Sequence, residues 1–437
     1  LPPNGVFAPS SGDVSGPASQ GRAISRDRRH RKCYYGRVWG WLRGFLRRES
    51  EAPMSGTRLM HLLQKRLLAQ PRIPFALKWW DGRSDRFGEG EPVFQIAIQD
   101  HRGRVALSRL DELAICEAYV AGFLDISGDM LQLMALRDAL TDRHPLHRLW
   151  RRLSPLIVGQ LRTDSRAVRK HYDVENNFHL IFMDPSRIYS HALFAHDDEP
   201  LETAQRRKLD FALEACRLVP GQHVLDVGGG WGGFTEHAGV RGIRVTSLTI
   251  SRESLRFLTD LIGRLHLPCR TIHENVLTYR SAEPYDAIVV LGVMEHLPNY
   301  RAALRQFHRL LKPGGRVYID ASAARTKYEK STFISRYIYP DNHSFFCLHD
   351  FLAALAETPF ELQAVHNDRH SYYLTCKAWV ENLERARGEV IRRWGERLYR
   401  TFRLYLWGSV HAFLSDRLQA YRLVLELPLT AREEGSP

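Results

Sequence analysis

The stretch VLDVGGGWGGF, residues Val224 to Phe234, decides the fold of this chain. Val224, Leu225 and Val227 form a short apolar run of the kind found in strands that are buried on both faces. Five glycines then follow within six positions, and a helix can begin at Phe234. The segment therefore predicts a strand, a glycine turn and a helix, with bare backbone and unpaired helix N–H groups available to a ligand at the turn.

The acid of this segment, Asp226, lies before the glycines. Gly228, Gly230 and Gly233 match the dinucleotide pattern G-x-G-x-x-G, but a nicotinamide-binding domain also needs an acid at the end of the next strand. That strand, expected at Ile243 to Ile250, has none. The arrangement resembles class I S-adenosylmethionine (SAM) methyltransferases, and a carboxylate suits a ligand with sulfonium and ammonium groups. A dinucleotide site and a glycine turn without a ligand are the alternatives.

The composition is that of a basic, globular protein. A chain of 437 residues suits two or three domains, and 44% hydrophobic residues can form a sizeable core. The formal charge is +13, and residues 1–53 contribute 10 basic and 4 acidic side chains to it. A positive balance favours an anionic partner, which can be a nucleic acid or an acidic membrane surface.

The cysteines and the hydrophobic runs indicate the compartment. Six scattered cysteines without a C-x-x-C pair argue against a zinc site and a disulfide framework, so a reducing cytosol is expected. No run approaches the 18 or so apolar residues of a membrane-spanning helix, and no signal peptide is recognisable. We therefore expect a cytoplasmic protein that associates peripherally with the inner face of the membrane.

Two regions precede the glycine loop's domain. Residues 1–53 are expected to be a basic, disordered leader, in which RVWGWLRGFLRR (37–48) has the spacing of a membrane-surface helix or is leader sequence without a function. Residues 54–150 are expected to form a small α+β domain for packing, substrate presentation or homodimer formation. Its pattern predicts hairpin strands at Pro92 to Gln99 and Val105 to Leu107, then a helix at Leu110 to Leu124.

The main domain is expected at residues 151–430, where strands and helices alternate after the glycine loop. The expected strands are Ile243–Leu248, Ala287–Leu291 and Arg316–Ile319, the expected helices are Arg252–Leu265 and Tyr300–Leu311, and the expected turn is Lys312–Gly315. This order predicts a Rossmann-like, doubly wound α/β sheet. Ligands of such sheets bind beyond the carboxyl ends of the strands. The polar residues expected to converge there are Asp226, Thr249, Asn275, Glu295 and Asp320.

Several motifs resemble one family. HYDVENNFHLIFMDPSRIYSHALF (171–194) is similar to the leading segment of cyclopropane-fatty-acyl-phospholipid synthases, a family that includes mycolic acid cyclopropane synthases. The resemblance continues through QRRKLDFAL (205–213), the glycine loop, LTISRES, GVMEHL (292–297), LLKPGGRVYID (310–320), RYIYP (336–340) and HSYYLTCKAW (370–379). It covers most of residues 54–427 and implies a SAM-dependent methyltransferase with C-terminal helices as a lid.

The resemblance also implies a cofactor site. In the family, a Tyr-Ser pair, the glycine loop, the end of the second strand and a position after the third strand hold SAM. Together with Asp226, the residues expected to bind it are Tyr189, Ser190, Gly228, Gly230, Thr249, Ser254 and Asn275. The family usually has Gln at position 254 and Cys at position 229, and both departures are compatible with binding.

The reaction implied by the resemblance joins the methyl carbon of SAM to a cis double bond of a phospholipid acyl chain. A base then removes a proton as a cyclopropane ring closes, or a methyl or methylene branch results. In the family this base is a bicarbonate ion held by Cys, Glu, His and Tyr. Here Glu295 and Tyr372 match, whereas His191 stands at the Cys position and Asp320 at the His position. These departures put bicarbonate in doubt, and His191, oriented by the neighbouring carboxylate of Asp320, is a candidate base itself. The alternative is that His191 only fills the place of the cysteine and that Asp320 caps a loop.

Two other functions compete with lipid methylation. An amine could be the acceptor on the same fold and cofactor, since the family borders on N-methyltransferases whose base is a protein side chain. A nucleic-acid partner would suit the isoelectric point of about 9.6. However, no RNA-binding module or RNA-methylase motif is visible, so no nucleic-acid partner and no metal are expected.

Overall fold

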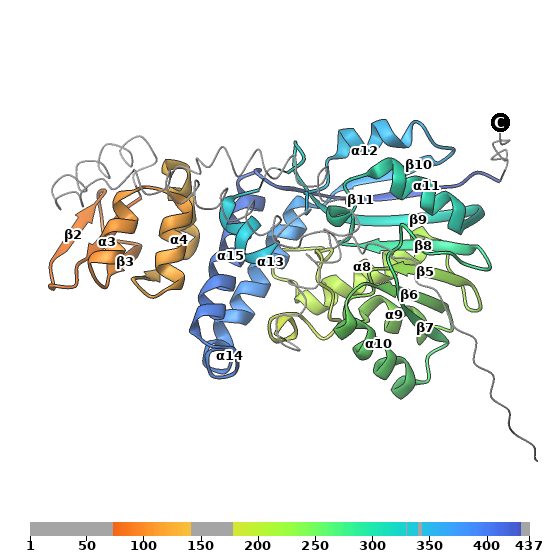
Figure 1. The fold of residues 1–437 in the computed structure, drawn as a ribbon, viewed down its shortest axis with the longest axis horizontal. Helices are drawn as coiled ribbons and strands as arrows, with labels where there is room; N and C mark the ends of the chain where they lie inside the picture. Colours follow the sequence, from red (N-terminus) through yellow and green to blue (C-terminus); the bar gives the residue numbers. More distant parts are fainter. Residues whose placement is uncertain (1–72, 141–177, 329, 340–342, 430–437) are drawn as a thin grey trace, which may run out of the picture. The chain divides into compact units, whose positions relative to one another are not determined.

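The computed structural model describes residues 73–140, 178–328, 330–339 and 343–429, except for the side chains of residues 138 and 139 (Figure 1). The expected leader, its amphipathic segment at 37–48 and HYDVENN (171–177) lie outside the described residues. The described chain contains a four-stranded sheet and a seven-stranded sheet.

The four-stranded sheet has the order β2-β1-β3-β4, with β1 parallel to β3 and the other pairs antiparallel. Its strands are β1 Phe75–Lys78, β2 Ser84–Phe87, β3 Phe94–Ile98 and β4 Leu124–Gly128. The accompanying helices are α3 His101–Ser108, α4 Glu112–Val120, α5 Met130–Ala135 and the 3₁₀ turn η1 Leu136–Ala139. Phe75, Leu77 and Phe94 are buried in the shared core of these elements.

The hairpin expected around residues 101–103 is wrong, because Val105 to Leu107 belong to α3. The carboxylate of Asp100 accepts hydrogen bonds from the amides of Arg102 (2.8 Å) and Gly103 (3.2 Å), which caps and starts a helix instead of a turn. The partners of β3 are β1 and β4. The helix expected at 110–124 ends at Val120 because Gly122 has a φ of +81°, and Leu124 begins β4.

The seven-stranded sheet has the order β10-β11-β9-β8-β5-β6-β7 and forms the doubly wound α/β domain. Its strands are β5 His223–Val227, β6 Arg244–Thr249, β7 Cys269–His273, β8 Tyr285–Leu291, β9 Leu311–Ala323, β10 Glu361–Asn367 and β11 Gln419–Glu426. β5 to β9 pair in parallel, whereas β11 is antiparallel to both of its neighbours. Helix α8 Leu201–Ala215 precedes β5. The helices that follow β5, β6, β8 and β9 are α9 Gly233–Gly239, α10 Arg252–Leu265, α11 Tyr300–Leu310 and α12 Leu348–Leu355.

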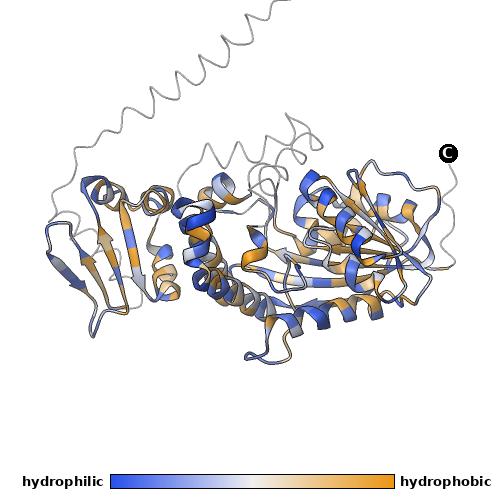
Figure 2. Cartoon of the chain, turned by 90° about the horizontal axis from the view of Figure 1, so that it is seen from below, coloured by the Kyte–Doolittle hydropathy of each residue, from blue (hydrophilic) through white to orange (hydrophobic). Residues whose placement is uncertain are grey.

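Both faces of this sheet are buried, which explains the continuous apolar runs in its sequence. Ile288 and Val290 of β8 pack in the cluster that contains α11 and α12, and Ala287 and Val289 pack in the one that contains α8 and α9. Figure 2 shows these central strands as predominantly hydrophobic. The expected turn at Lys312–Gly315 is instead the start of β9, where the register with β8 shifts between Tyr285 and Ala287.

Three helices lie near the C-terminal end of the described chain, and one of them, α15, packs against the four-stranded domain. They are α13 Arg369–Arg385, α14 Arg387–Trp394 and α15 Glu396–Leu414. Arg400 donates to the carbonyl oxygens of Tyr119 and Leu124 (both 3.1 Å), and Arg403 donates to the Tyr119 hydroxyl (2.9 Å). Across the described residues, no helix is both long and apolar enough to cross a bilayer.

Candidate active site

The glycine loop after β5 bends sharply back over β6. The amides of Gly228 and Gly229 both donate to the carbonyl oxygen of Leu248 (2.9 Å), and Gly228, Gly230 and Gly232 have positive φ angles of 80°, 50° and 77°. A Cβ atom at Gly229 would lie 1.7 Å from Ser247 Oγ, so this position has no room for a side chain. At Gly230 the nearest atom would be the Gly228 oxygen at 3.7 Å, so Gly230 leaves its space open.

Asp226, at the end of β5, fixes the position of the glycine loop through hydrogen bonds. Its Oδ2 atom accepts hydrogen bonds from Thr235 Oγ1 and Ser247 Oγ, each 3.0 Å away. Burial raises the pKa of Asp226 to about 6, although the two hydroxyls oppose the rise. These two hydrogen bonds give this expected cofactor residue a structural role as well, since they connect β5 to α9 and β6.

A cavity of about 130 Å³ lies beyond the carboxyl ends of β5 and β6. All eight expected cofactor residues line it: Tyr189, Ser190, Asp226, Gly228, Gly230, Thr249, Ser254 and Asn275. The sheet therefore brings together residues that are up to 86 positions apart in the chain. We call this space the cofactor cavity.

Ser190 connects the cofactor cavity to a fully buried ion pair. Its hydroxyl donates to Asp320 Oδ2 (3.1 Å) and accepts from Lys208 Nζ (2.7 Å), which itself lies 3.2 Å from Asp320 Oδ2. The amide of Gly292 donates to Asp320 Oδ1 (2.7 Å). Asp320 thereby joins the end of β9 to the segment after β8 and to the leading segment. Burial lowers the pKa of Lys208, and the Asp320 charge opposes this shift.

His191 contacts a different carboxylate from the expected one. Its Nε2 atom lies 3.2 Å from Asp368 Oδ2, and Asp368 also pairs with Arg422 Nε at 2.9 Å. Burial raises the pKa of Asp368, but His191 and Arg422 outweigh it and lower the pKa overall. His191 is fully buried beside the Tyr372 ring, and among the described residues it lines neither large cavity. The geometry therefore favours a packing role for His191.

Glu295 follows β8 in the short helix η3, Met294–His296. Its Oε1 atom accepts hydrogen bonds from the Ser322 amide (2.7 Å) and the Ser322 hydroxyl (2.6 Å). Its Oε2 atom is buried and has no hydrogen-bond partner within the described part of the chain. Burial raises the pKa of Glu295 to about 7, and the hydrogen bonds from Ser322 only partly oppose it. A carboxylate in this state can accept a proton near neutral pH.

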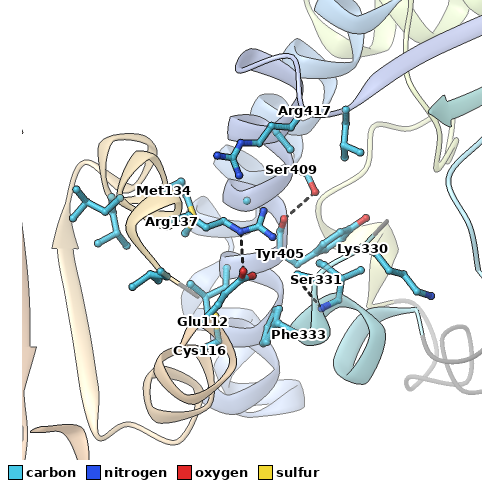
Figure 3. A pocket seen from close by; sticks show the side chains of 18 of the residues that line it. Glu112, Cys116, Met134, Arg137, Lys330, Ser331, Phe333, Tyr405, Ser409 and Arg417 are labelled. Atoms are coloured by element: carbon cyan, nitrogen blue, oxygen red, sulfur yellow. Dashed lines mark hydrogen bonds and ion pairs between the residues drawn. The ribbon is translucent and has the colours of Figure 1, made fainter. Parts of the chain in front are cut away.

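A second cavity of about 780 Å³ lies between the four-stranded domain, the segment after β9 and α15 (Figure 3). Side chains such as Leu77, Leu133, Phe333 and Leu404 make much of its wall apolar. Its volume is within the range of about 300–1,000 Å³ found for small-molecule sites. We call this space the acyl cavity because of the function proposed below.

Aromatic rings and Ser322 line one part of the acyl cavity. The Tyr339 and Tyr405 hydroxyls are 3.0 Å apart, and Tyr372 stacks on Phe413 with ring centres 4.3 Å apart. Burial raises the pKa of Tyr339 to about 12, and the neighbouring Tyr405 and Tyr189 side chains oppose the rise. Since Tyr189 lines the cofactor cavity, the two cavities meet at the Tyr189 and Tyr339 side chains.

Two histidines complete the wall between the cavities. His296 lines the cofactor cavity, and its ring centre lies 5.1 Å from that of His343. The His343 ring stacks on Tyr339 with centres 4.2 Å apart. Glu295 lies in the same wall. Its hydrogen-bond partner Ser322 lines the acyl cavity, and His296, which follows Glu295 in the chain, lines the cofactor cavity.

The residues at the family's bicarbonate position do not fit that ion well. Asp320 is an acceptor whose oxygens contact Ser190, Lys208 and Gly292, and His191 Nε2 contacts Asp368. An anion needs donors, and the four expected positions leave the Tyr372 hydroxyl as the principal one. We therefore derive no step through bicarbonate.

The fold and the cofactor cavity define a class I SAM-dependent methyltransferase. Residues 159–423 match the family described as mycolic acid cyclopropane synthetase, and the chain belongs to this family. Residues 62–142 match a domain family of unknown function, DUF7884.

The chain is similar to named relatives along most of its length. It is 28% identical to a probable fatty acid methyltransferase of Pseudomonas putida, covering 82% of this chain and 92% of that one. It is 29% identical to the cyclopropane-fatty-acyl-phospholipid synthase of Escherichia coli K12, covering 71% and 82%. The solved mycolic acid cyclopropane synthase CmaA1 complexed with SAH and CTAB superposes with a TM-score of 0.56 at 25% identity, covering 60% of this chain and 98% of that one. SAM is accordingly the cofactor.

Sequence reasoning missed three contributors to the site: Lys208, Ser322 and Asp368. Lys208 stands in the family motif QRRKLDFAL, where a lysine among apolar positions of a helix is a signal for a buried charge. Ser322 lies two residues after Asp320, so the alternation of strand β9 could have placed it on the same face. No local pattern marks Asp368 as the partner of His191, 177 positions away.

Proposed function

We propose that this enzyme transfers the SAM methyl group to a cis double bond in an acyl chain of a phospholipid and forms a cyclopropane. The observation that carries the proposal is the contact between the two cavities, where the cofactor cavity, lined by the glycine loop, adjoins a large apolar cavity at Tyr189 and Tyr339. A long hydrocarbon chain fills the second cavity and brings its double bond to this wall.

Methyl transfer needs an aligned, dry contact because an alkene is a weak nucleophile. SAM supplies the methyl group: the alkene π electrons form the new C–C bond while the S–C bond breaks, which leaves a carbocation on the lipid. The rings of Tyr339, Tyr372 and Tyr405 line the acyl cavity, and their electron-rich faces stabilise the positive carbon. The glycine loop and Tyr189 orient the sulfonium side.

Ring closure releases one proton from the transferred carbon, and the electrons of that C–H bond form the last bond of the ring. Ser322 lines the acyl cavity and donates its hydroxyl proton to Glu295 Oε1 at 2.6 Å. We infer that Ser322 accepts the substrate proton as it passes its own to Glu295. A pKa of about 7 keeps much of Glu295 ionised in neutral solution, as this step requires.

A phospholipid substrate also requires the enzyme to act at a membrane. The acyl chains of phospholipids lie in bilayers, so the enzyme must reach a membrane surface. The formal charge of +13 attracts anionic lipids, which supports a peripheral association with the membrane. The small domain contributes one wall of the acyl cavity and so takes part in binding the substrate.

The test is to incubate the protein with SAM and dioleoyl phospholipid and to analyse the lipids by mass spectrometry after mild oxidation. A cyclopropane adds one CH₂ per acyl chain and removes the oxidisable double bond. The Gly230→Val variant, whose side chain enters the cofactor cavity, is the inactive control. A product that keeps its double bond and carries the methyl group on nitrogen would replace this proposal with an N-methyltransferase.

A further inference from the structure

The acyl cavity contains two arginines that the methyl transfer does not use. Arg137 belongs to η1 of the small domain, and Arg417 follows the end of α15. Both line the acyl cavity, and Figure 3 shows their guanidinium groups extending toward one another from opposite elements. We call these two side chains the arginine pair.

Among the described residues that line the acyl cavity, basic side chains outnumber acidic ones. The carboxylate of Glu112, which also lines the acyl cavity, lies 3.1 Å from Arg137 Nε. The other acid of the described lining, Asp416, lies close to Arg325 (3.6 Å) and Arg369 (3.5 Å). Of the lining residues in the described part of the chain, five are basic and two are acidic. Burial and the Arg137 charge lower the pKa of both Arg417 and His411, which places Arg137 near both groups.

Two like charges that share a partly enclosed space repel one another, and an anion between them removes the repulsion. A guanidinium group presents paired N–H donors that match the oxygens of a phosphate. The lining beside the arginine pair is apolar, with Leu133, Met134 and Phe413, and it continues to Tyr339 and Tyr372. The cavity therefore suits a ligand with one anionic group and a long apolar chain.

Building on the lipid substrate of the proposed function, we propose that Arg137 and Arg417 bind the phosphodiester of the phospholipid whose acyl chain is methylated. Each arginine comes from a different part of the fold, and each reaches the phosphate from its own side of the acyl cavity. The arginine pair fixes the head group, and thereby the distance along the acyl chain at which a double bond meets the Tyr189–Tyr339 wall. A free fatty acid would offer a carboxylate to the same donors, so the experiment must separate these two sources.

The experiment compares steady-state kinetics of the wild type, Arg137→Gln and Arg417→Gln on three lipids in micelles of a neutral detergent. Dioleoylphosphatidylcholine carries the phosphodiester without net charge, oleate carries a carboxylate, and methyl oleate carries neither. We expect each variant to raise the KM for the phospholipid roughly 10- to 100-fold, the range for losing a charged hydrogen bond. The kcat should stay within about two-fold, because the reacting groups are intact. The KM for methyl oleate should not change.

Arg86→Gln is the matched control, because Arg86 is an exposed arginine of the same small domain, paired with Glu91 at 3.5 Å outside the acyl cavity. SAM affinity and thermal melting of each variant show whether the fold is intact. Arg417→Gln carries the test if Arg137→Gln unfolds through the loss of the Glu112 partner. An unchanged phospholipid KM in Arg417→Gln overturns the proposal. Turnover of oleate alone, with a KM that rises in the variants, assigns the pair to a carboxylate and also overturns it.

The inference can be separated from the proposed reaction by measuring binding without turnover. Dihexanoylphosphatidylcholine is monomeric in water below its critical micelle concentration and can be titrated calorimetrically in that range. If the wild type methylates no lipid but binds this probe, and Arg417→Gln does not, the head-group site stands while the proposed reaction fails. Equal binding by both proteins removes the head-group site whatever the reaction is.

Discussion

Lys208 Nζ lies 3.2 Å from Asp320 Oδ2, and neither side chain is exposed to solvent. The Ser190 hydroxyl bridges the two, and Asp320 also accepts the amide of Gly292. Ser190 and Gly292 both line the cofactor cavity. The ion pair therefore fixes the positions of Ser190 and Gly292 in the wall of the cofactor cavity.

Removing one member of this ion pair should be far more harmful than removing both. Lys208→Met leaves Asp320 as an uncompensated buried charge, which costs about 3–5 kcal/mol of unfolding free energy. The double variant Lys208→Met/Asp320→Asn leaves no charge and should recover much of that loss. Urea denaturation of the three proteins measures both effects. Equal losses in the single and double variants would contradict a coupled pair.

Gly230→Val should abolish SAM binding, because its side chain fills the cofactor cavity and because valine rarely adopts the φ of +50° found at this position. The new side chain enters the cofactor cavity, and at Gly230 a Cβ atom approaches no other part of the chain closer than 3.7 Å. Gly263→Ala on the exposed side of α10, where a Cβ atom meets nothing within 4 Å, is the control and should keep wild-type affinity. Calorimetric titration with SAM decides, and wild-type affinity in Gly230→Val would mean that the cofactor binds elsewhere.

Activity should fall as the pH drops through about 7, because protonated Glu295 cannot accept the substrate proton. Glu295→Gln should lower kcat roughly 10²- to 10⁴-fold, the usual loss for a general base. Ser322→Ala should show a loss of similar size, because the substrate proton reaches Glu295 through the Ser322 hydroxyl. A pH–rate profile of Glu295→Gln that retains the wild-type inflection would assign it to another group. Depleting dissolved carbonate should leave the wild-type rate unchanged.

The raised pKa of Glu295 should also affect the stability of the fold. Activity should increase as the pH rises, whereas stability should decrease. Glu295 in the folded protein keeps its proton up to about pH 7, whereas in the unfolded chain its pKa returns to the ordinary value of 4.5. Its ionisation therefore destabilises the fold progressively as the pH rises from 4.5 to 7, and fully above that range. At pH 8, Glu295→Gln should be more stable than the wild type by on the order of 1–3 kcal/mol. If Glu295→Gln were less stable than the wild type at pH 8, the ionised Glu295 side chain would not destabilise the fold, which would contradict its raised pKa.

His191 gives a prediction that separates packing from catalysis. A general base in this position would make His191→Ala lose roughly 10²- to 10⁴-fold in rate. Because His191 is buried against Asp368 and Tyr372, we expect His191→Phe to lower the melting temperature and to leave the pH–rate profile in place. Asp368 keeps Arg422 as a partner in this variant. A flattened acid limb in His191→Phe would restore His191 as the base.

Membrane attachment can be tested by sedimentation with vesicles. The protein should bind vesicles that contain anionic lipid and dissociate as salt rises, since its net charge is +13. Deleting residues 1–53 removes a net charge of +6 and should weaken this binding. Equal binding by both proteins would assign the attachment to the folded domains.

The cofactor side of the site is predictable from sequence because its residues follow strand ends. Thr249 is the last residue of β6, and Asn275 follows shortly after the end of β7. A parallel sheet places such strand ends together. The strands β6, β8 and β9 were expected near their observed places for the same reason, since buried strands carry continuous apolar runs.

The lipid side could not be predicted in this way. The acyl cavity is formed by side chains as distant as Leu77 and Arg417, and no periodicity within either segment indicates the other. Asp320 was expected to stand beside His191, but strand alternation says nothing of Lys208, which reaches Asp320 from α8. The α3 helix was mistaken for a strand because three apolar residues cannot distinguish the two, and the cap by Asp100 decides.

The position of β11 has a consequence for how the domain assembles. This strand lies between β9 and β10, and Arg422 of β11 stands opposite Asp320 of β9 in the register. During synthesis, β9 emerges about a hundred residues before the neighbour that covers its second edge. Until then β9 exposes unpaired amides and carbonyls, and Asp320 has no neighbouring strand on that side. A nascent chain in this state is open to pairing with a second copy, so binding of a chaperone to the β9 edge would protect it during translation.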